Sequence, residues 1–297
     1  MKIVISGASG FLGSALDAHL RRRGIEVMRL VRHSASDPAT EQQWDPSSGD
    51  LDPIVLSGAD AVINLNGRSI SQGRWSARVK AELRSSRLDA TRTIVHAIHR
   101  SNNPPPVLIN ASASGFYGDR GDEALDEKTG PGEGFLAGLS LEWEEAALEA
   151  QSQATRVVLI RLGMVLGNGA ALEKMLPSFK LGLGGPMGSG RQWWPWIAMT
   201  DVIGAVDHIL AHGDLAGPVN LVAPETVTSR DFARALGKHL GRPAVLPAPA
   251  FAIKMAFGEM AEALLLSSTK AVPKVLEKSG YTFIAPTLAE AFRVVLG

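Results

Sequence analysis

The first thirteen residues constrain the fold of this chain more than any other stretch. Residues 2–6 favour a strand, which leads directly into Gly7, Gly10 and Gly13 in the spacing G-x-x-G-x-x-G; leucines at every fourth position then form one stripe of a helix. At Gly7 and Gly10 the missing side chains leave room for a pyrophosphate, and the helix N-terminus offers free N–H groups to it. The sequence therefore predicts a dinucleotide site at this turn, with contacts from Gly7, Ser9, Gly10, Phe11 and Leu12.

Strand-like and helix-like segments alternate over the first two-thirds of the chain. Strands are predicted at 25–31, 59–67, 107–112 and 155–161, with a short further strand near 42–44, and helices at 76–100 and 136–150. Apolar strands separated by helices predict an α/β, doubly wound parallel sheet, the Rossmann arrangement. Ligands of such sheets bind beyond the carboxyl ends of the strands. We therefore expect the cofactor to contact Asn64, Leu65, Asn66, Ala111 and Ser112, which end two of these strands.

The pattern changes at about residue 167. Glycine-rich loop sequence, a tryptophan cluster and shorter helical segments follow it. We expect a cofactor-binding Rossmann domain over 1–166, its sheet completed by part of 197–225, and a smaller C-terminal α+β substrate or cap region over 167–297.

The composition of the chain excludes several classes of binding partner. The 297 residues include 30 basic and 30 acidic side chains and no cysteine. No net field attracts nucleic acid or an anionic membrane, and disulfides and Cys-ligated metals are excluded. The N-terminal apolar run is a short strand, not a signal peptide, and no apolar stretch reaches the length of a membrane span. We expect a cytoplasmic protein with a small-molecule substrate; the sequence leaves an oligomer open.

Several motifs together resemble a known superfamily. They are the N-terminal glycine turn, Asn64–Gly67, Ser112–Gly118 and Ile160–Gly167. The chain resembles the extended short-chain dehydrogenase/reductases of the nucleoside-diphosphate-sugar epimerase type. Further matches, at Arg74–Trp75, Ser86–Arg87, Trp143–Glu144, Gly188–Gln192 and Arg242–Pro243, resemble one epimerase-like branch with its own C-terminal domain. Members of that branch have been labelled NAD-dependent epimerase/dehydratase proteins, or cell-division inhibitors.

The chain departs from this superfamily at the position of its acid–base pair. Active members carry Tyr-x-x-x-Lys on the helix after the fifth strand, whereas the matching positions here are Phe135 and Leu139. Neither side chain exchanges a proton. We therefore predict Tyr117, Ser112 and Ser114 as the catalytic groups, because their hydroxyls follow the strand that ends beside the nicotinamide in this fold. The alternative is that these hydroxyls only satisfy loop backbone groups and that the tyrosine packs.

Arg32 follows the second predicted strand directly. An NAD-preferring enzyme has an acidic residue there for the ribose 2′-hydroxyl, whereas an arginine pairs with a 2′-phosphate. The sequence therefore favours NADP over NAD as the cofactor, the alternative being a solvated cation at the end of a strand.

Three other clusters have two readings each. Seven basic residues between Arg68 and Arg92 either hold phosphates or form a solvated face. Trp193, Trp194 and Trp196 either wall a substrate pocket or pack between two parts of the chain. His208 and His212 lie one helical turn apart but lack the acidic partner of a metalloprotease motif, so no metal site is predicted.

Two functional hypotheses remain from the sequence. The first is an NADP-dependent oxidoreductase or sugar-nucleotide-epimerase-like enzyme with a nonstandard active site. The second is a non-catalytic NADP-binding sensor or regulator. The absent Tyr and Lys favour the second, whereas Ser112–Tyr117 and the C-terminal region favour the first.

Overall fold

A computed structural model of the chain describes residues 1–71, 73–167 and 169–297. Its centre is a sheet of seven parallel strands in the order β11-β7-β5-β4-β1-β2-β3. These strands are β1 (Lys2–Ser6), β2 (Glu26–Val31), β3 (Glu41–Gln43), β4 (Ala61–Asn64), β5 (Val107–Ala113), β7 (Arg156–Leu162) and β11 (Gly217–Leu221). The predicted doubly wound α/β fold is confirmed, and β11 completes the sheet from within the expected range 197–225.

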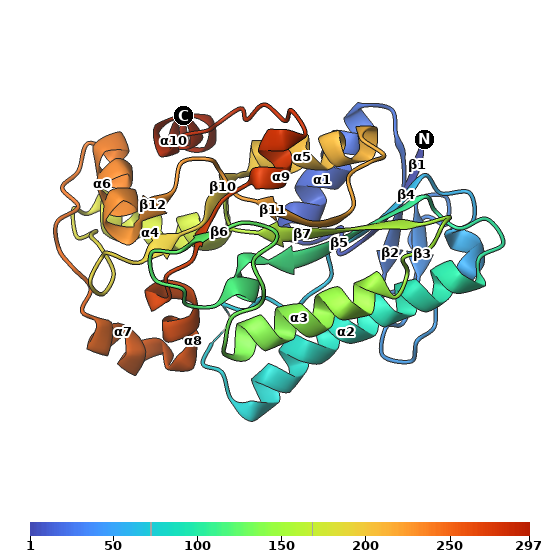
Figure 1. Cartoon of the computed structure of the whole chain (residues 1–297), viewed down its shortest axis with the longest axis horizontal. Helices are drawn as coiled ribbons and strands as arrows, with labels where there is room; N and C mark the ends of the chain where they lie inside the picture. Colours follow the sequence, from blue (N-terminus) through green and yellow to red (C-terminus); the bar gives the residue numbers. More distant parts are fainter. Residues whose placement is uncertain (72, 168) are drawn as a thin grey trace.

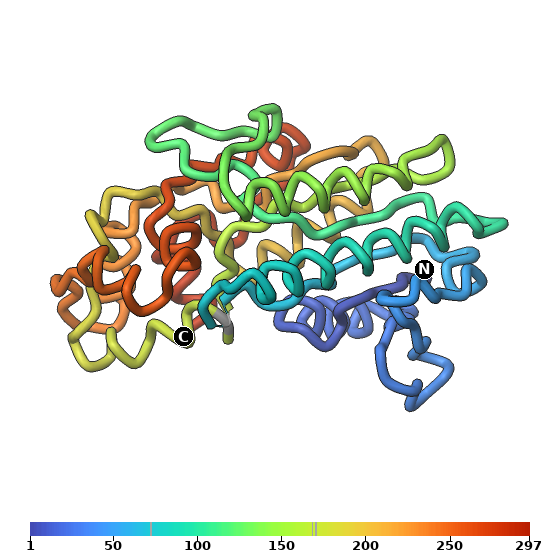
Figure 2. The backbone as a smooth tube through the Cα atoms, turned by 90° about the horizontal axis from the view of Figure 1, so that it is seen from below, coloured from blue at the N-terminus to red at the C-terminus, as the bar shows by residue number. Residues whose placement is uncertain are grey.

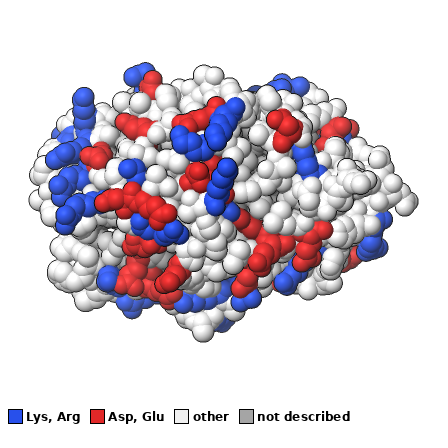
Figure 3. Space-filling model, in the orientation of Figure 1, with Lys and Arg blue, Asp and Glu red and all other residues white. Residues whose placement is uncertain are grey.

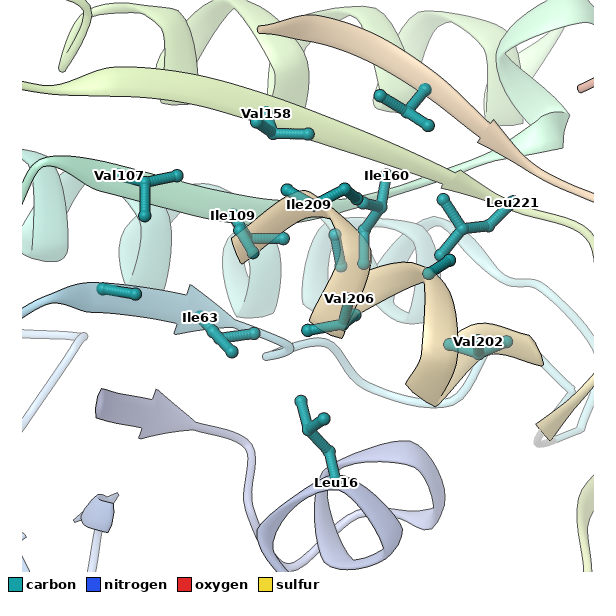
Figure 4. Close-up of a cluster of buried hydrophobic side chains, with 14 of the residues drawn as sticks. Leu16, Ile63, Val107, Ile109, Val158, Ile160, Val202, Val206, Ile209 and Leu221 are labelled. Atoms are coloured by element: carbon teal, nitrogen blue, oxygen red, sulfur yellow. The ribbon is translucent and has the colours of Figure 1, made fainter. Parts of the chain in front are cut away.

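Helices cover both faces of the sheet (Figure 1). On one face lie α1 (Phe11–Arg22) and α5 (Met199–Ala211), and on the other α2 (Ala77–Arg100) and α3 (Phe135–Leu148), which run side by side in Figure 2. Between α1, α5 and the sheet, aliphatic side chains fill the core (Figure 4): Leu16, Ile63, Val107, Ile109, Val158, Ile160, Val202, Val206, Ile209 and Leu221. Because each crossover helix runs opposite to its strands, α1, α2 and α3 begin at the carboxyl edge of the sheet.

Most of the C-terminal elements gather beyond this edge, on the left of Figure 1, and one of them, α9, lies against strand β11 of the sheet. They are β8 (Met164–Leu166), α4 (Ala170–Lys180), β9 (Trp193–Trp194), β10 (Trp196–Ala198), β12 (Val227–Thr228), α6 (Ser229–Leu240), α7 (Ala250–Phe257), α8 (Glu259–Ala261), η3 (Glu262–Leu266), β13 (Lys270–Ala271), α9 (Lys274–Lys278) and α10 (Leu288–Leu296). Within the N-terminal half, η1 (Pro53–Val55), η2 (Ser114–Tyr117) and β6 (Ala124–Leu125) complete the set. Since α5 and β11 belong to the sheet layers, the two predicted regions interleave.

Short strand pairs connect the C-terminal elements to the loops of the sheet. β10 pairs with β8 in parallel, β12 with β9 in antiparallel, and β13 with β6 in parallel. A separate apolar core forms around Trp194, Trp196, Phe232 and Phe292. Pairing of β13 with β6 holds a segment near the C-terminus against the chain that follows β5, at the carboxyl edge.

None of the helices in the described residues combines the length and the apolar composition needed to cross a membrane.

Gly13 decides how closely α1 packs against the preceding turn. A Cβ at this position would lie 2.1 Å from the carbonyl oxygen of Gly7 and 2.8 Å from the Cα of Ala8. We therefore expect Gly13→Ala to lower the free energy of unfolding by about 1–3 kcal/mol, the usual cost of overpacking. Urea unfolding measures this difference. In the matched control Gly10→Ala the new Cβ meets only the Gly7 oxygen, at 3.3 Å, so its loss is smaller; equal losses would contradict the packing argument.

Candidate functional site

Gly7 and Gly10, in the turn between β1 and α1, have different surroundings. Gly7 has a φ of +76°, and a Cβ there would lie 2.8 Å from the backbone carbonyl of Leu65. Its missing side chain therefore lets the turn lie against the chain that follows β4, and its contact with a pyrophosphate stays a prediction. Gly10 is exposed, and among the described residues a Cβ at Gly10 would meet only the Gly7 oxygen, at 3.3 Å. The space beside Gly10 is therefore open, and its contact with a pyrophosphate stays a prediction.

The N-terminus of α1 offers an anion site beside Gly10. Gly10 is the N-cap residue, no side chain caps the helix, and its first turn has no acidic residue. The first N–H groups of a helix lack intrahelical acceptors and lie at the positive end of its dipole. Ser9 is exposed, and Phe11 and Leu12 are half-buried at this end. The turn therefore fits the pyrophosphate of a dinucleotide.

The side chain of Asn64 has a structural role. Its side chain is fully buried, accepts from Ser6 Oγ (2.7 Å) and donates to Thr91 Oγ1 (2.9 Å) and Asn110 Oδ1 (2.6 Å). The amide therefore ties β1, β4, β5 and α2 together below the site. Of the other predicted contacts, Ala111 is buried in β5, whereas Leu65 and Asn66 are half-buried after β4 and lie at the edge.

Ser112 belongs to a buried charge network. Its hydroxyl donates to Glu144 Oε1 at 2.5 Å, and Arg161 binds both oxygens of this carboxylate at 2.8 Å. Both charged side chains are 5 % exposed. Burial alone would lower the pKa of the Arg161 guanidinium, but the hydrogen bonds and charge of Glu144 outweigh it and the pKa is raised. The Arg161 guanidinium thus stays charged, and the Glu144 side chain that it binds occupies the Ser112 hydroxyl.

Tyr117 extends this network to the edge strand β11. The phenol donates to Asn220 Oδ1 (2.7 Å) and accepts from Arg161 Nη1 (2.9 Å), and the side chain is fully buried. Burial raises the pKa of the phenol. A phenol enclosed by protein partners, with a raised pKa, is a poor proton donor to a substrate. This geometry argues against the predicted catalytic role of Tyr117 and favours the alternative, packing.

Ser114 is the remaining predicted hydroxyl. It begins η2 directly after β5 and is half-buried. Within the described part of the chain, its hydroxyl has no hydrogen-bond partner. Of the three predicted catalytic groups, Ser114 alone keeps a hydroxyl available at the carboxyl edge.

The positions matched to the Tyr–Lys pair hold two apolar side chains, and one of them, Phe135, lies against a lysine. Phe135 begins α3 and packs edge-on against Trp75 (5.3 Å between ring centroids), and Leu139 is buried. Lys80 Nζ lies 5.0 Å from the centre of the Phe135 ring and 2.6 Å from the Glu259 carboxylate of α8. Sequence reasoning did not single out Lys80, because its only signal was membership of the basic run.

Most of the basic run between Arg68 and Arg92 is neutralised by protein groups. Arg68 and Arg78 pair with Glu82, Lys80 with Glu259 and Arg84 with Glu142, and Arg74 donates to the Met255 carbonyl. Acidic and basic side chains likewise lie close together over much of the face in Figure 3. The run is therefore largely a paired surface; Arg87, half-buried between α2 and α3, differs from it.

Arg32 lies where the sequence placed it. It directly follows β2, is exposed, and forms no ion pair with a carboxylate of the described residues. The neighbouring Arg29, by contrast, pairs with Glu41 at 3.0 Å. Arg32 is thus positioned at the carboxyl edge with its charge uncompensated.

The two aromatic clusters are structural. Trp194 and Trp196 belong to the C-terminal core, and the crevice beside them measures only about 10 Å³, so packing is the better reading. The rings of His208 and His212 stack at 3.8 Å, and their nitrogens bond to Ser279 and to the His208 carbonyl. The described residues contain no group of three or more His, Cys, Asp or Glu arranged to hold a metal.

A hollow of about 400 Å³ opens beside the N-terminus of α1. The residues around it are Phe11, Ser14, Ala15, Gly167, Met199, Thr200, Val294 and Val295, from α1, the end of β8, α5 and α10. The Thr200 hydroxyl is buried and lacks a hydrogen-bond partner among the described residues. This hollow is continuous with the predicted cofactor turn through Phe11.

Comparison with known families identifies the fold and the arrangement of its two parts. Residues 3–222 match the model of the NAD dependent epimerase/dehydratase family. The chain belongs to this family. Residues 248–295 match a second model, described as a domain of unknown function, DUF1731.

Relatives of this epimerase/dehydratase chain extend over its full length. Epimerase family protein MT2273 of Mycobacterium tuberculosis is 42 % identical over 97 % of this chain and 95 % of its own. Epimerase family protein SDR39U1 of Bos taurus is 37 % identical over the whole of both. The crystal structure of human SDR39U1 (isoform 2) with NADPH superposes with a TM-score of 0.92 at 33 % identity, covering 99 % of each chain.

The position of Tyr117 in the epimerase/dehydratase chain gives a stability prediction. Tyr117→Phe keeps the ring but leaves Arg161 and Asn220 each without one buried partner. The free energy of unfolding should fall by about 1–3 kcal/mol, the cost of unpaired buried polar groups. Thermal unfolding measures it, alongside dinucleotide affinity, which should stay unchanged. Unchanged stability with weakened affinity would restore Tyr117 to the binding site.

Proposed function

We propose that this chain binds NADPH at the carboxyl edge of its sheet. The observation that carries the proposal is the open face of Gly10 at the uncapped N-terminus of α1, where a pyrophosphate meets free N–H groups. The NADPH in the human SDR39U1 structure, which shares this fold at a TM-score of 0.92, supports it. The groups proposed to hold the cofactor are Gly10, Phe11 and Leu12 for the pyrophosphate, Leu65 and Asn66 beside it, and Arg32 for the 2′-phosphate.

We further propose an NADPH-dependent oxidoreductase or epimerase-like reaction on a small molecule. When bound, a nicotinamide supplies or accepts a hydride, and the protein has to handle the accompanying proton. Ser114 and Lys80 are the candidate groups, because one has an available hydroxyl after β5 and the other lies against Phe135 at the start of α3. The Lys80–Glu259 ion pair also joins α2 to α8, so the C-terminal region reaches the same edge.

A non-catalytic NADPH sensor is the second candidate. The apolar contact of Phe135 with Trp75 and the burial of Leu139 favour it, because neither standard acid–base position has a proton to exchange. The two candidates agree on the cofactor and differ in turnover.

Arg32 tests the choice of cofactor. Arg32→Ala removes the proposed 2′-phosphate partner, so NADPH binding should weaken by about 1.5–3 kcal/mol, the scale of a charge-assisted hydrogen bond, while NADH affinity changes little. Fluorescence titration of both nucleotides measures this. Arg22→Ala is the matched control, since it removes the same charge at the far end of α1. Equal losses for NADPH and NADH would show that Arg32 acts only structurally.

Turnover separates the enzyme from the sensor. The test follows NADPH oxidation on a panel of carbonyl compounds with the wild type, Ser114→Ala, Lys80→Gln and Tyr117→Phe. Loss of a general acid lowers a rate by about 10²–10⁴-fold, and we expect this for Ser114→Ala or Lys80→Gln but not for Tyr117→Phe. Tight NADPH binding without oxidation on any compound would favour the sensor, and a selective loss in Tyr117→Phe would contradict our reassignment of that residue.

A further inference from the structure

The end of the molecule formed by α6 and the loops that follow α4 and α6 is cationic, although the chain as a whole is neutral. Residues 180–192 and 229–258 contain seven Lys and Arg side chains and one acid, Asp231, which is bonded to Thr228 in the capping box of α6. Both Figure 1 and Figure 2 show these elements at the left end of the molecule. The zero net charge, from which no attraction to an anionic surface is expected, therefore does not describe this end.

Four exposed cations lie on α6 or directly after a helix of this end. They are Lys180 at the end of α4, Arg234 and Lys238 one turn apart on α6, and Arg242 just after α6. Within the part of the chain that the structure describes, none of the four forms an ion pair, unlike the basic run of α2. Lys and Arg side chains also gather along the left rim of Figure 3, over α6. Their charge is therefore available to an anionic partner.

Exposed apolar side chains lie next to these cations in the chain. The loop after α4 exposes Leu181 and Leu183, by 74 % and 60 %, and the loop after α6 exposes Val245 and Leu246, by 74 % and 51 %. The two loops lie side by side, because the Leu246 N–H donates to the Gly184 carbonyl at 3.3 Å. We call these four apolar side chains, together with the four cations, the end surface.

The helix α7 is not part of the end surface, although it also exposes apolar side chains. Its Phe251 and Met255 are exposed, but the Met255 carbonyl accepts from Arg74, which lies just before α2. This contact places α7 toward the carboxyl edge of the sheet. The end surface therefore stands apart from the edge at which the cofactor is proposed to bind.

The shape of the end surface favours a membrane over a protein as its partner. Contiguous exposed apolar groups mark interaction sites. A protein that recognises an apolar anchor encloses it in a groove, whereas here the apolar side chains project outward from two loops. Projecting apolar side chains that are flanked by cations are suited to the boundary between anionic headgroups and acyl chains.

We propose that the end surface docks the protein on an anionic phospholipid membrane. Its four apolar side chains enter the interface, and its four cations lie among the headgroups. The contact is peripheral and requires no membrane-spanning helix. It does not depend on the proposed function, because none of the groups proposed to hold the cofactor or to handle the proton belongs to the end surface.

Co-sedimentation of the full chain with phospholipid vesicles tests the proposal. Vesicles of phosphatidylcholine alone are compared with vesicles of phosphatidylcholine mixed with anionic phosphatidylglycerol. The wild type should bind the mixed vesicles more tightly than phosphatidylcholine alone, and added salt should weaken this binding because it screens exposed charges. Absence of wild-type binding to the mixed vesicles overturns the proposal.

A charge variant carries Arg234→Gln and Lys238→Gln. Its matched control, Arg22→Gln with Arg100→Gln, removes the same charge from the ends of α1 and α2, at the opposite edge of the sheet. The charge variant should lower the partition coefficient onto mixed vesicles about tenfold or more, and the control should bind like the wild type. Equal losses in both would show an effect of net charge alone and contradict the assigned surface.

An apolar variant carries Leu183→Asn and Val245→Asn, with Ile54→Asn and Leu148→Asn, two exposed positions elsewhere, as its matched control. The apolar variant should bind both kinds of vesicle more weakly, whereas the control should not. Thermal unfolding checks that each variant is folded. Calorimetry with polyglutamate tests the other occupant: binding of this probe without binding of vesicles would identify an acidic polypeptide as the partner and overturn the membrane assignment.

Discussion

The ion pair between Arg161 and Glu144 is the interaction around which the carboxyl edge of this protein is built. It joins β7 to α3 through two hydrogen bonds and fixes Ser112 of β5 and Tyr117 of η2, which in turn reaches Asn220 of β11. Removing one partner of a buried pair typically costs about 3–5 kcal/mol, because the other charge is left uncompensated. The pair therefore fixes the arrangement of β5, β7, β11 and α3. Its net contribution to the free energy of unfolding is small by comparison.

Because of this network, the hydroxyls of Ser112 and Tyr117 are hydrogen-bonded to protein groups, which argues against a role in proton transfer to a substrate. Ser112 lies near the end of β5, the strand nearest the expected nicotinamide, and Tyr117 follows this strand. Their oxygens bond to Glu144, Arg161 and Asn220. We therefore propose Ser114 and Lys80 as the groups that handle the proton. Lys80 pairs with Glu259 of the C-terminal region. A reaction site that includes α8 would depend on how the C-terminal elements close over the sheet.

The cation proposed to bind the cofactor differs from the structural ones because its charge has no protein partner among the described residues. Arg161 and Glu144 are buried and paired, so their charges satisfy each other and the fold. Arg32 is exposed at the end of β2 without a carboxylate among the described residues. Cations preorganised at the carboxyl edge are what a ligand rich in phosphates requires. The same edge holds the uncapped N-terminus of α1, which adds a second positive element.

The sequence alone determined the parallel sheet, the position of most of its strands and the dinucleotide turn, because these depend on local order: apolar runs, the spacing of Gly7, Gly10 and Gly13, and alternation with helices. Arg32 was also placed correctly, since it directly follows a strand. Only the tertiary structure decided that Gly7 packs against Leu65, that Asn64, Ser112 and Tyr117 are buried, and that Lys80 lies against Phe135. Each of these depends on which distant segment supplies the partner, as Glu144 does for Ser112, and residue spacing in one chain holds no information on that choice.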